Sequence, residues 1–160
     1  MEIRNFFDFP PDVTQVDSGF ERPSDRKVMF FVGKKYYLFR GNRFEPGYPR
    51  PLTDLGLPDN LERIDSAMIW GHSGKAYLFA DDRYWKLDTK FNQVQNDYPR
   101  VLRVWEGVPS NMDSALLWSG NGVNYFFKGQ HFYTLDNEKM QIKQKAQTIA
   151  DFWFPNVCNR

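Results

Sequence analysis

The amino-acid sequence repeats itself with a period of 48 residues, and this repeat limits the possible folds more than any other feature. The dipeptide Asp-Ser occurs three times at that interval, beginning at Asp17, Asp65 and Asp113. Two more sets of landmarks keep the same spacing: apolar pairs beginning at Phe30, Leu78 and Phe126, and aromatic pairs beginning at Tyr36, Tyr84 and Phe132. Such a period is typical of one supersecondary unit copied in a stacked or radial array. The sequence therefore predicts an all-β propeller, a fold that usually serves as a binding platform.

The middle copy, residues 64–111, has the pattern of a propeller blade. Residues 64–70 and 76–79 are mostly apolar and predict two buried strands, and residues 84–88 alternate like a half-buried third strand. The dipeptide at 81–82 predicts a tight hairpin turn, as do those at 33–34 and 129–130. Val94 falls in a short outer strand, and residues 101–105 predict a short connecting helix. Four antiparallel strands per copy match one blade, whose first strand would line the central channel.

The repeat divides one domain of residues 1–160 into three blades and a leading segment. The predicted blades cover residues 17–63, 64–111 and 112–160. Residues 1–16 are too short for a copy and predict the tail of an incomplete blade. The outer strand of each blade would be an edge, which charge and proline protect from further pairing.

Charge and hydropathy exclude several classes of partner. Lysine and arginine number 21 against 20 aspartate and glutamate, so a net charge of +1 gives no electrostatic reason to expect nucleic acid or an anionic membrane. No apolar run approaches the roughly 18–20 residues of a membrane span, and the sequence from Met1 opens no signal peptide. The one cysteine, Cys158, is either a plain thiol or half of a disulfide whose partner lies elsewhere.

The sequence contains no recognisable catalytic constellation. Its two histidines, His72 and His131, are far apart, so there is no His-Glu-x-x-His zinc helix. Ser73 and Ser119 lie in glycine turns without the strand–turn–helix context of a nucleophile elbow. We therefore expect that this chain is not an enzyme.

Three kinds of motif recur along the chain. The best examples are Tyr125-Phe126-Phe127-Lys128-Gly129, Glu45-Pro46-Gly47-Tyr48-Pro49 and Trp105-Glu106-Gly107-Val108-Pro109. They resemble the hemopexin-like repeat, and the likeness covers nearly the whole chain in three copies. Within that family the chain is most similar to the C-terminal propeller of matrix metalloproteinases, and residues 50–58 resemble the gelatinase A type. The resemblance implies a four-bladed disc. This chain would supply the last three blades of that disc, and the disc's own first blade would be largely missing.

The resemblance also implies ions in the central channel. The main-chain carbonyls of three aspartates would ligate calcium, and a second carbonyl layer two residues further on would hold another ion; the two layers are Asp17, Asp65 and Asp113, and Gly19, Ala67 and Ala115. Calcium takes oxygen ligands. Sodium and chloride are further ions implied for the channel, and zinc would belong to a catalytic domain outside this chain. The other interpretation is that each aspartate carboxylate hydrogen-bonds the backbone of a neighbouring blade.

A disulfide in this family joins the first blade of the four-bladed disc to its last blade. Cys158 matches its second partner, and the first partner is absent from this chain. An arc of three blades would also leave two apolar blade faces, through which, or through a bridge at Cys158, we expect a homodimer.

By resemblance, the chain is a non-catalytic protein-binding (exosite) module of a secreted zinc matrix metalloproteinase, working outside the cell. Its partner would be a matrix protein such as collagen or gelatin, or a tissue inhibitor of metalloproteinases. The alternative is a stand-alone hemopexin-fold protein that carries or stores a ligand. Recognition residues tend to lie on loops of a rigid scaffold, and the candidates here are Lys34, Lys35, Arg40, Arg43, Arg50, Lys86, Lys90, Arg100 and Arg103, interleaved with Tyr36, Tyr48, Tyr84 and Tyr98. The other interpretation, which is favoured for any single residue, is a solvated rim with the aromatic side chains packed between blades. The outer turn of the middle copy has a single lysine, Lys90, where gelatinase A has a lysine-rich surface, which disfavours inhibitor docking.

Overall fold

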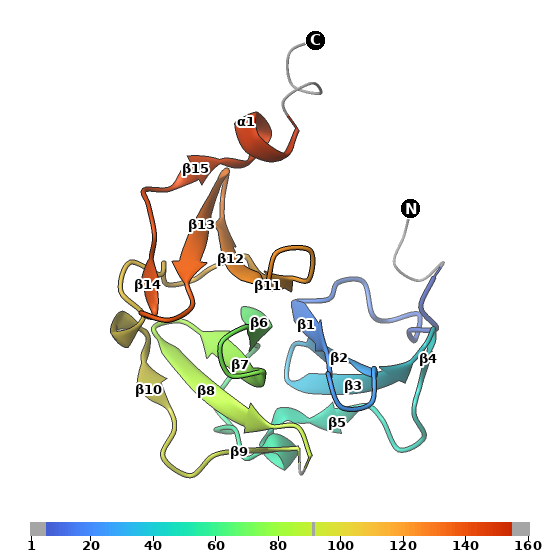
Figure 1. Ribbon diagram of the computed structural model, residues 1–160. Helices are drawn as coiled ribbons and strands as arrows, with labels where there is room; N and C mark the ends of the chain where they lie inside the picture. The colour runs from blue at the N-terminus through green and yellow to red at the C-terminus, as the bar shows by residue number, and fades with distance from the viewer. Residues whose placement is uncertain (1–5, 91, 155–160) are drawn as a thin grey trace.

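The computed structural model describes residues 6–90 and 92–154, which form three antiparallel β-sheets around a shared axis (Figure 1). We call them the first, second and third blades. The first contains β1 (Ser18–Glu21), β2 (Val28–Val32), β3 (Lys35–Arg40), β4 (Arg43–Phe44) and β5 (Arg50–Pro51). The second contains β6 (Ser66–Trp70), β7 (Lys75–Ala80), β8 (Arg83–Asp88), β9 (Gln93–Val94) and β10 (Arg100–Val101). The third contains β11 (Ser114–Trp118), β12 (Val123–Lys128), β13 (His131–Asp136), β14 (Gln141–Ile142) and β15 (Gln147–Thr148). These sheets confirm the prediction of an all-β propeller fold with three blades.

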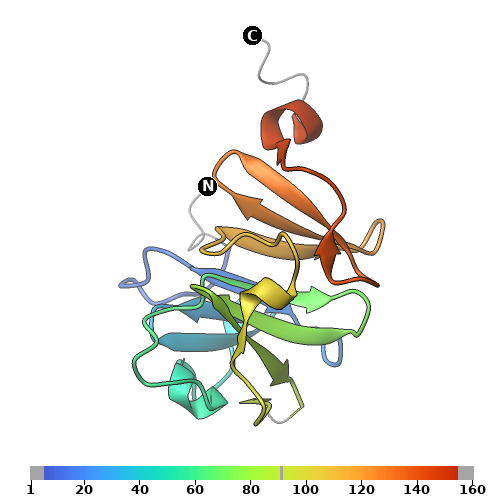
Figure 2. The same ribbon diagram turned by 90° about the vertical axis from the view of Figure 1, so that its left-hand side faces the viewer.

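Short helices occur where the chain leaves a blade. They are η2 (Leu52–Leu55), η3 (Leu102–Val104) and α1 (Ile149–Trp153). Figure 2 shows η3, in yellow, on the connection from the second blade to the third. No helix among the described residues is long and apolar enough to cross a membrane.

The 48-residue period reappears in the strand register. The serine that opens each inner strand pairs with a phenylalanine of the next strand: Ser18 with Phe31, Ser66 with Phe79 and Ser114 with Phe127. Each blade also has a fifth strand of two residues, β5, β10 or β15, which pairs with the third strand. The expectation of four strands per blade missed it, because two residues are too short to show an alternating pattern.

The predicted hairpin turns lie between the second and third strands of each blade. Gly33, Asp81 and Gly129 have φ values of 52°, 53° and 58°. Aspartate tolerates this left-handed conformation better than most residues other than glycine. The equivalent turn is therefore preserved in the second blade without a glycine.

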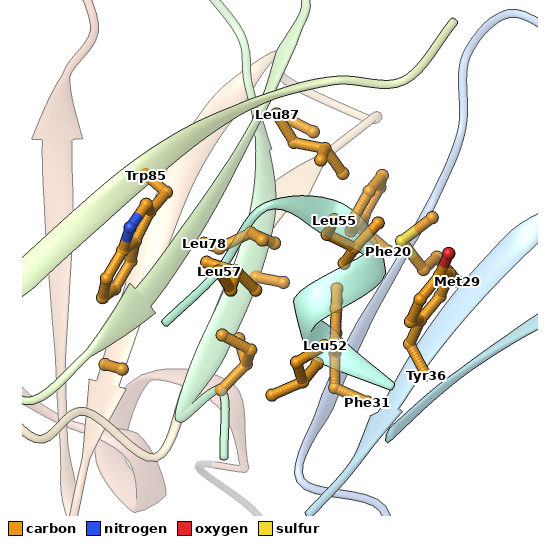
Figure 3. Close-up of a cluster of buried hydrophobic side chains, with 14 of the residues drawn as sticks. Phe20, Met29, Phe31, Tyr36, Leu52, Leu55, Leu57, Leu78, Trp85 and Leu87 are labelled. Carbon is orange, nitrogen blue, oxygen red and sulfur yellow. The ribbon is translucent and has the colours of Figure 1, made fainter. Parts of the chain in front are cut away.

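Apolar side chains fill the space between neighbouring blades. Between the first and second blades, Phe31, Leu55 and Leu78 are fully buried, with η2 packed among them (Figure 3). Between the second and third, Trp105 is fully buried, and its ring lies 5.3 Å from that of Tyr77. Each such large apolar side chain contributes roughly 1.5–3 kcal/mol by leaving water. The inter-blade cores thus fix the blades around the axis.

The outward face of the first blade is covered by the chain itself. Residues 6–16 pass along it, and the Asp8 N–H donates to the Asn42 carbonyl oxygen at 2.8 Å. Phe9 and Val13 are buried there, and the Phe9 ring lies 4.7 Å from the Phe39 ring. This end of the arc therefore does not present the bare apolar face that three unclosed blades were expected to leave.

The outward face of the third blade is only partly covered. The Trp153 ring of α1 stacks on the Trp118 ring at 4.4 Å. Four large apolar side chains of the third blade and α1 stay exposed, and together we call them the third-blade surface: Leu116, Trp118, Phe152 and Phe154. Of the two expected apolar faces, this is the one that solvent reaches.

Candidate functional site

The three repeated aspartates surround one hollow at the shared axis. Each directly precedes the inner strand of its blade, β1, β6 or β11. The hollow has a volume of about 140 Å³ and is lined by Gln15, Asp17, Arg63, Asp65, Met112 and Asp113. The structure thus brings together the three aspartates that the repeat singled out.

Each aspartate carboxylate accepts a backbone N–H from the hairpin turn of its own blade. The donors and distances to Oδ2 are Gly33 to Asp17 at 2.6 Å, Asp81 to Asp65 at 2.8 Å, and Gly129 to Asp113 at 2.6 Å. The expected alternative placed these bonds on a neighbouring blade, which is wrong because the turn of the same blade folds back to the start of the inner strand. The contact to the neighbouring blade comes one residue later, where Ser18 Oγ donates to the Ile64 carbonyl oxygen at 2.8 Å.

Arg63 is the one cationic side chain among the residues that line the hollow. Arg63 Nε is 2.9 Å from Asp65 Oδ1. The Asp65 side chain is nearly buried, whereas 60% of the Arg63 side chain is exposed. The hydrogen bond and charge of Asp65 raise the pKa of Arg63, and Asp17 and Asp81 add to this effect. Arg63 therefore remains a permanent positive charge beside the aspartates.

The second predicted layer lines a separate hollow of about 290 Å³. Gly19, Ala67 and Ala115 all lie on its wall, and most of its other lining side chains are apolar. A Cβ atom at Gly19 would lie 2.8 Å from Phe30 Cδ1 and 2.9 Å from the Met29 carbonyl oxygen, so a larger residue does not fit. The structure thus places the second predicted layer on the inner strands of the three blades, and the first layer directly before these strands.

The donor chemistry of the aspartate hollow suits a hard cation. Its lining includes no histidine or cysteine, the usual nitrogen and sulfur ligands of zinc. Among the described residues, no three His, Cys, Asp or Glu side chains are grouped as a metal site, and one oxygen of each carboxylate is already bound to a hairpin turn. Calcium takes main-chain oxygen as well as carboxylate oxygen.

The histidines lie in different surroundings and different blades. The His72 ring is 5.2 Å from the Trp70 ring in the turn after β6. His131 begins β13, where it pairs with Lys128 and Thr148. The structure does not bring these two side chains together.

Two arginines of the predicted contact set are held in matching positions. Arg50 lies over the Tyr48 ring at 4.9 Å, and Arg100 lies over the Tyr98 ring at 4.8 Å. Both arginines are exposed. Each guanidinium has a second contact as well: Arg50 Nε donates to the Gly47 carbonyl oxygen at 3.3 Å, and Arg100 Nη2 pairs with a carboxylate oxygen of Asp97. An aromatic face and a polar contact together orient each arginine.

Two of the four predicted contact tyrosines are not available to a partner. Tyr36 and Tyr84 are buried because their side chains turn toward the inter-blade cores. Burial raises the pKa of Tyr36 to about 12. Only Tyr48 and Tyr98 are partly exposed, and the candidate recognition surface shrinks accordingly.

Several of the predicted basic contact residues form ion pairs. Glu45 lies 2.9 Å from both Lys27 Nζ and Arg40 Nε, and hydrogen bonds from these two cations lower the pKa of Glu45. Lys34 Nζ lies 2.9 Å from a Glu62 carboxylate oxygen. Cys158, the predicted disulfide half, lies outside the described residues.

Sequence reasoning missed a buried polar residue, Asn124. It lies in β12 and is fully buried between the second and third blades. The equivalent positions of the other copies are Val28 and Ala76. A polar residue where the repeat is otherwise apolar was the signal that could have revealed it.

Comparison with known proteins places the repeat in a family. The hemopexin family model matches residues 16–59 and 64–110, more than half of the chain. The chain is 39% identical to matrix metalloproteinase-2 of Drosophila melanogaster over 112 residues. These residues make up 69% of this chain and 15% of the relative. The chain is 36% identical over 100 residues to mouse matrix metalloproteinase-25, covering 62% of this chain and 16% of the relative. The chain thus matches a small part of each relative's length.

Solved structures share the fold at low sequence identity. A 2S albumin seed protein from Dolichos superposes with a TM-score of 0.74 at 17% identity, over 93% of this chain and 76% of the other. The hemopexin-fold protein CP4 of cow pea gives a TM-score of 0.69 at 17% identity, over 88% and 70%. Together with the family match and the metalloproteinase relatives, these comparisons lead to one conclusion: the chain belongs to the hemopexin family and is a hemopexin-like domain of the matrix metalloproteinase type.

Proposed function

We propose that the chain is a non-catalytic exosite module of a secreted matrix metalloproteinase, which binds an extracellular protein and brings it to the catalytic domain. The observation that carries this proposal is the extent of the match to the Drosophila enzyme. The matching segment is 69% of this chain but 15% of the enzyme, and it includes residues of the hemopexin repeats. The similarity therefore supports a binding role for this part of the molecule.

The partner we propose is a matrix protein, collagen or gelatin, or a tissue inhibitor of metalloproteinases. The exposed arginines Arg50 and Arg100 support a protein partner, because an exposed guanidinium can bind the carboxylates of a partner, which at Arg100 would compete with Asp97. They occupy the same position in two successive blades, so an extended partner with repeated acidic groups would contact both. The carrier or storage alternative is not favoured, since the seed proteins share only the fold.

We also propose calcium as the resident ion of the aspartate hollow. The main-chain oxygens of Asp17, Asp65 and Asp113 would hold it, one from each blade. When bound, the ion would supply a positive charge that joins the three inner strands. The carboxylates keep their own task, which is to hold the hairpin turns.

A binding assay with matched variants tests the proposed function. The purified chain is passed over immobilised collagen, gelatin and a tissue inhibitor, and the double variant Arg50→Gln/Arg100→Gln is compared with Lys139→Gln/Lys145→Gln on the third blade. We expect the chain to bind at least one of these proteins, and we expect the arginine variant alone to lose about tenfold or more in affinity, which corresponds to about 1.4 kcal/mol. Absence of binding to all three proteins would refute the proposal, and equal loss in both variants would refute the role of the arginines.

A further inference from the structure

Arg63 breaks the symmetry of the aspartate hollow. The residue two positions before each aspartate is Gln15 in the first blade, Arg63 in the second and Asn111 in the third. Gln15 Nε2 donates to Asp17 Oδ1 at 3.3 Å, and Arg63 Nε donates to Asp65 Oδ1 at 2.9 Å. The same position thus contacts the aspartate in two blades, but only the second blade places a charge there.

The hollow has an excess of negative charge, which Arg63 partly offsets. Three carboxylates lie on its wall, and Arg63 is the one cationic residue among those that line it. Like charges grouped around a small volume repel one another, and the repulsion is larger where the side chains are shielded from water, as Asp65 is. A cation at this place relieves the repulsion, whether it comes from a side chain or from an ion.

We propose that Arg63 is a built-in counter-cation of the aspartate hollow, which stabilises the ion-free domain and weakens the binding of calcium there. Arginine stays charged at all relevant pH values, so the positive charge at this place does not depend on pH. Its charge opposes that of a divalent ion bound close to Asp65. The weaker binding of calcium rests on the calcium proposal, whereas the stabilisation of the ion-free domain does not.

The repeat itself supplies the test substitution. Arg63→Gln gives the second blade the residue that the first blade already has at Gln15, so the side chain still reaches the aspartate without a charge. Arg83→Gln is the matched control, because Arg83 is equally exposed, lies in the same blade and does not line the hollow. Gln15→Arg is the reciprocal variant and adds a second guanidinium.

The first measurement is thermal unfolding of the full chain in a chelator, at low and high sodium chloride. We expect Arg63→Gln to unfold about 2–4 °C below the unsubstituted chain at low salt, the shift that corresponds to about 1 kcal/mol in a domain of this size. Most of the loss should disappear at high salt, which screens the carboxylates. The inference is overturned if Arg63→Gln shows no salt-sensitive loss beyond that of Arg83→Gln.

The second measurement is calorimetric titration of the same proteins with calcium chloride. We expect Arg63→Gln to bind calcium about tenfold more tightly than the unsubstituted chain, Gln15→Arg to bind it more weakly, and Arg83→Gln to be unchanged. Equal affinities in all four proteins would overturn the opposition between Arg63 and calcium. If none of the proteins binds calcium, the calcium proposal and the opposition between Arg63 and calcium fail together. The salt-dependent unfolding still decides whether Arg63 relieves the repulsion among the carboxylates.

Discussion

The side-chain amide of Asn124, in the third blade, accepts the backbone N–H of Gly71, in the second blade, at 2.8 Å. Its Nδ2 donates to the Ile69 carbonyl oxygen at 2.7 Å. One fully buried side chain therefore satisfies two backbone groups at the end of β6. Gly71 also has no room for a side chain, because a Cβ atom there would lie 2.7 Å from Asn137 Nδ2 and 2.8 Å from the Gly122 carbonyl oxygen. This polar contact sets how the two blades meet.

Replacing Asn124 by alanine is expected to destabilise the protein strongly. The substitution removes the acceptor of the partly buried Gly71 N–H and a donor to the buried Ile69 carbonyl oxygen, and a buried group left without its partner costs about 1–3 kcal/mol. The free energy of unfolding, measured by chemical denaturation, should fall by that amount or more. Asn96→Ala, at an exposed asparagine, is the control and should change it little. Equal stability of the two variants would show that the Asn124 contacts do not hold the blades together.

Each aspartate that precedes an inner strand is expected to stabilise the hairpin turn of its own blade. Asp65→Ala removes the acceptor of the Asp81 N–H and should lower the free energy of unfolding by about 1–3 kcal/mol. Asp65→Asn keeps an acceptor oxygen and should lose less. Amide hydrogen exchange at Asp81 should accelerate in the alanine variant. Asp82→Ala, whose side chain is exposed, is the control, and an equal effect there would argue against this role.

Stability is expected to decline at high pH because of Tyr36, which is buried, and Tyr98, which is partly buried. Burial raises the pKa of Tyr36 and Tyr98 from 10.0 to about 12. A raised folded-state pKa means that the stabilisation is complete below pH 10 and is lost as pH rises toward 12. Denaturation at several pH values, together with tyrosinate absorbance, checks this window. The double variant Tyr36→Phe/Tyr98→Phe should lose less stability over the same range, and an unchanged alkaline loss would refute the assignment.

We expect self-association through the exposed apolar side chains of the third-blade surface. The third-blade surface is exposed, whereas residues 6–16 cover the outward face of the first blade. Light scattering with reductant present should show a concentration-dependent dimer, and Trp118→Ser/Phe152→Ser should abolish it. A monodisperse monomer at every concentration would contradict a homodimer through this face.

The period of 48 residues was sufficient to predict the three blades, because strand register and hairpin turns repeat with it at Ser18, Ser66 and Ser114. It was also sufficient to bring Asp17, Asp65 and Asp113 to one place, since equivalent residues of a radial repeat lie around its axis. What the repeat could not predict is what differs between copies.

Individual side chains were missed where tertiary contacts decide their position. The pattern left open whether Tyr36 and Tyr84 contact a partner or pack between blades, because alternation along a strand does not say which face is buried when both faces are apolar. The covering of the first blade by Phe9 depends on contacts with Phe39 that no local pattern contains. Asn124 has a partner in another blade, 53 residues away.

The central claim, that this domain binds substrate for a catalytic domain elsewhere, is tested most directly by competition. The purified chain is added in excess to full-length matrix metalloproteinase-2 of Drosophila melanogaster, and cleavage of collagen or gelatin is measured beside cleavage of a short peptide. We predict that the chain slows cleavage of the protein substrate and leaves peptide cleavage unchanged. Unchanged cleavage of both, or cleavage of the peptide by the chain alone, would contradict the account.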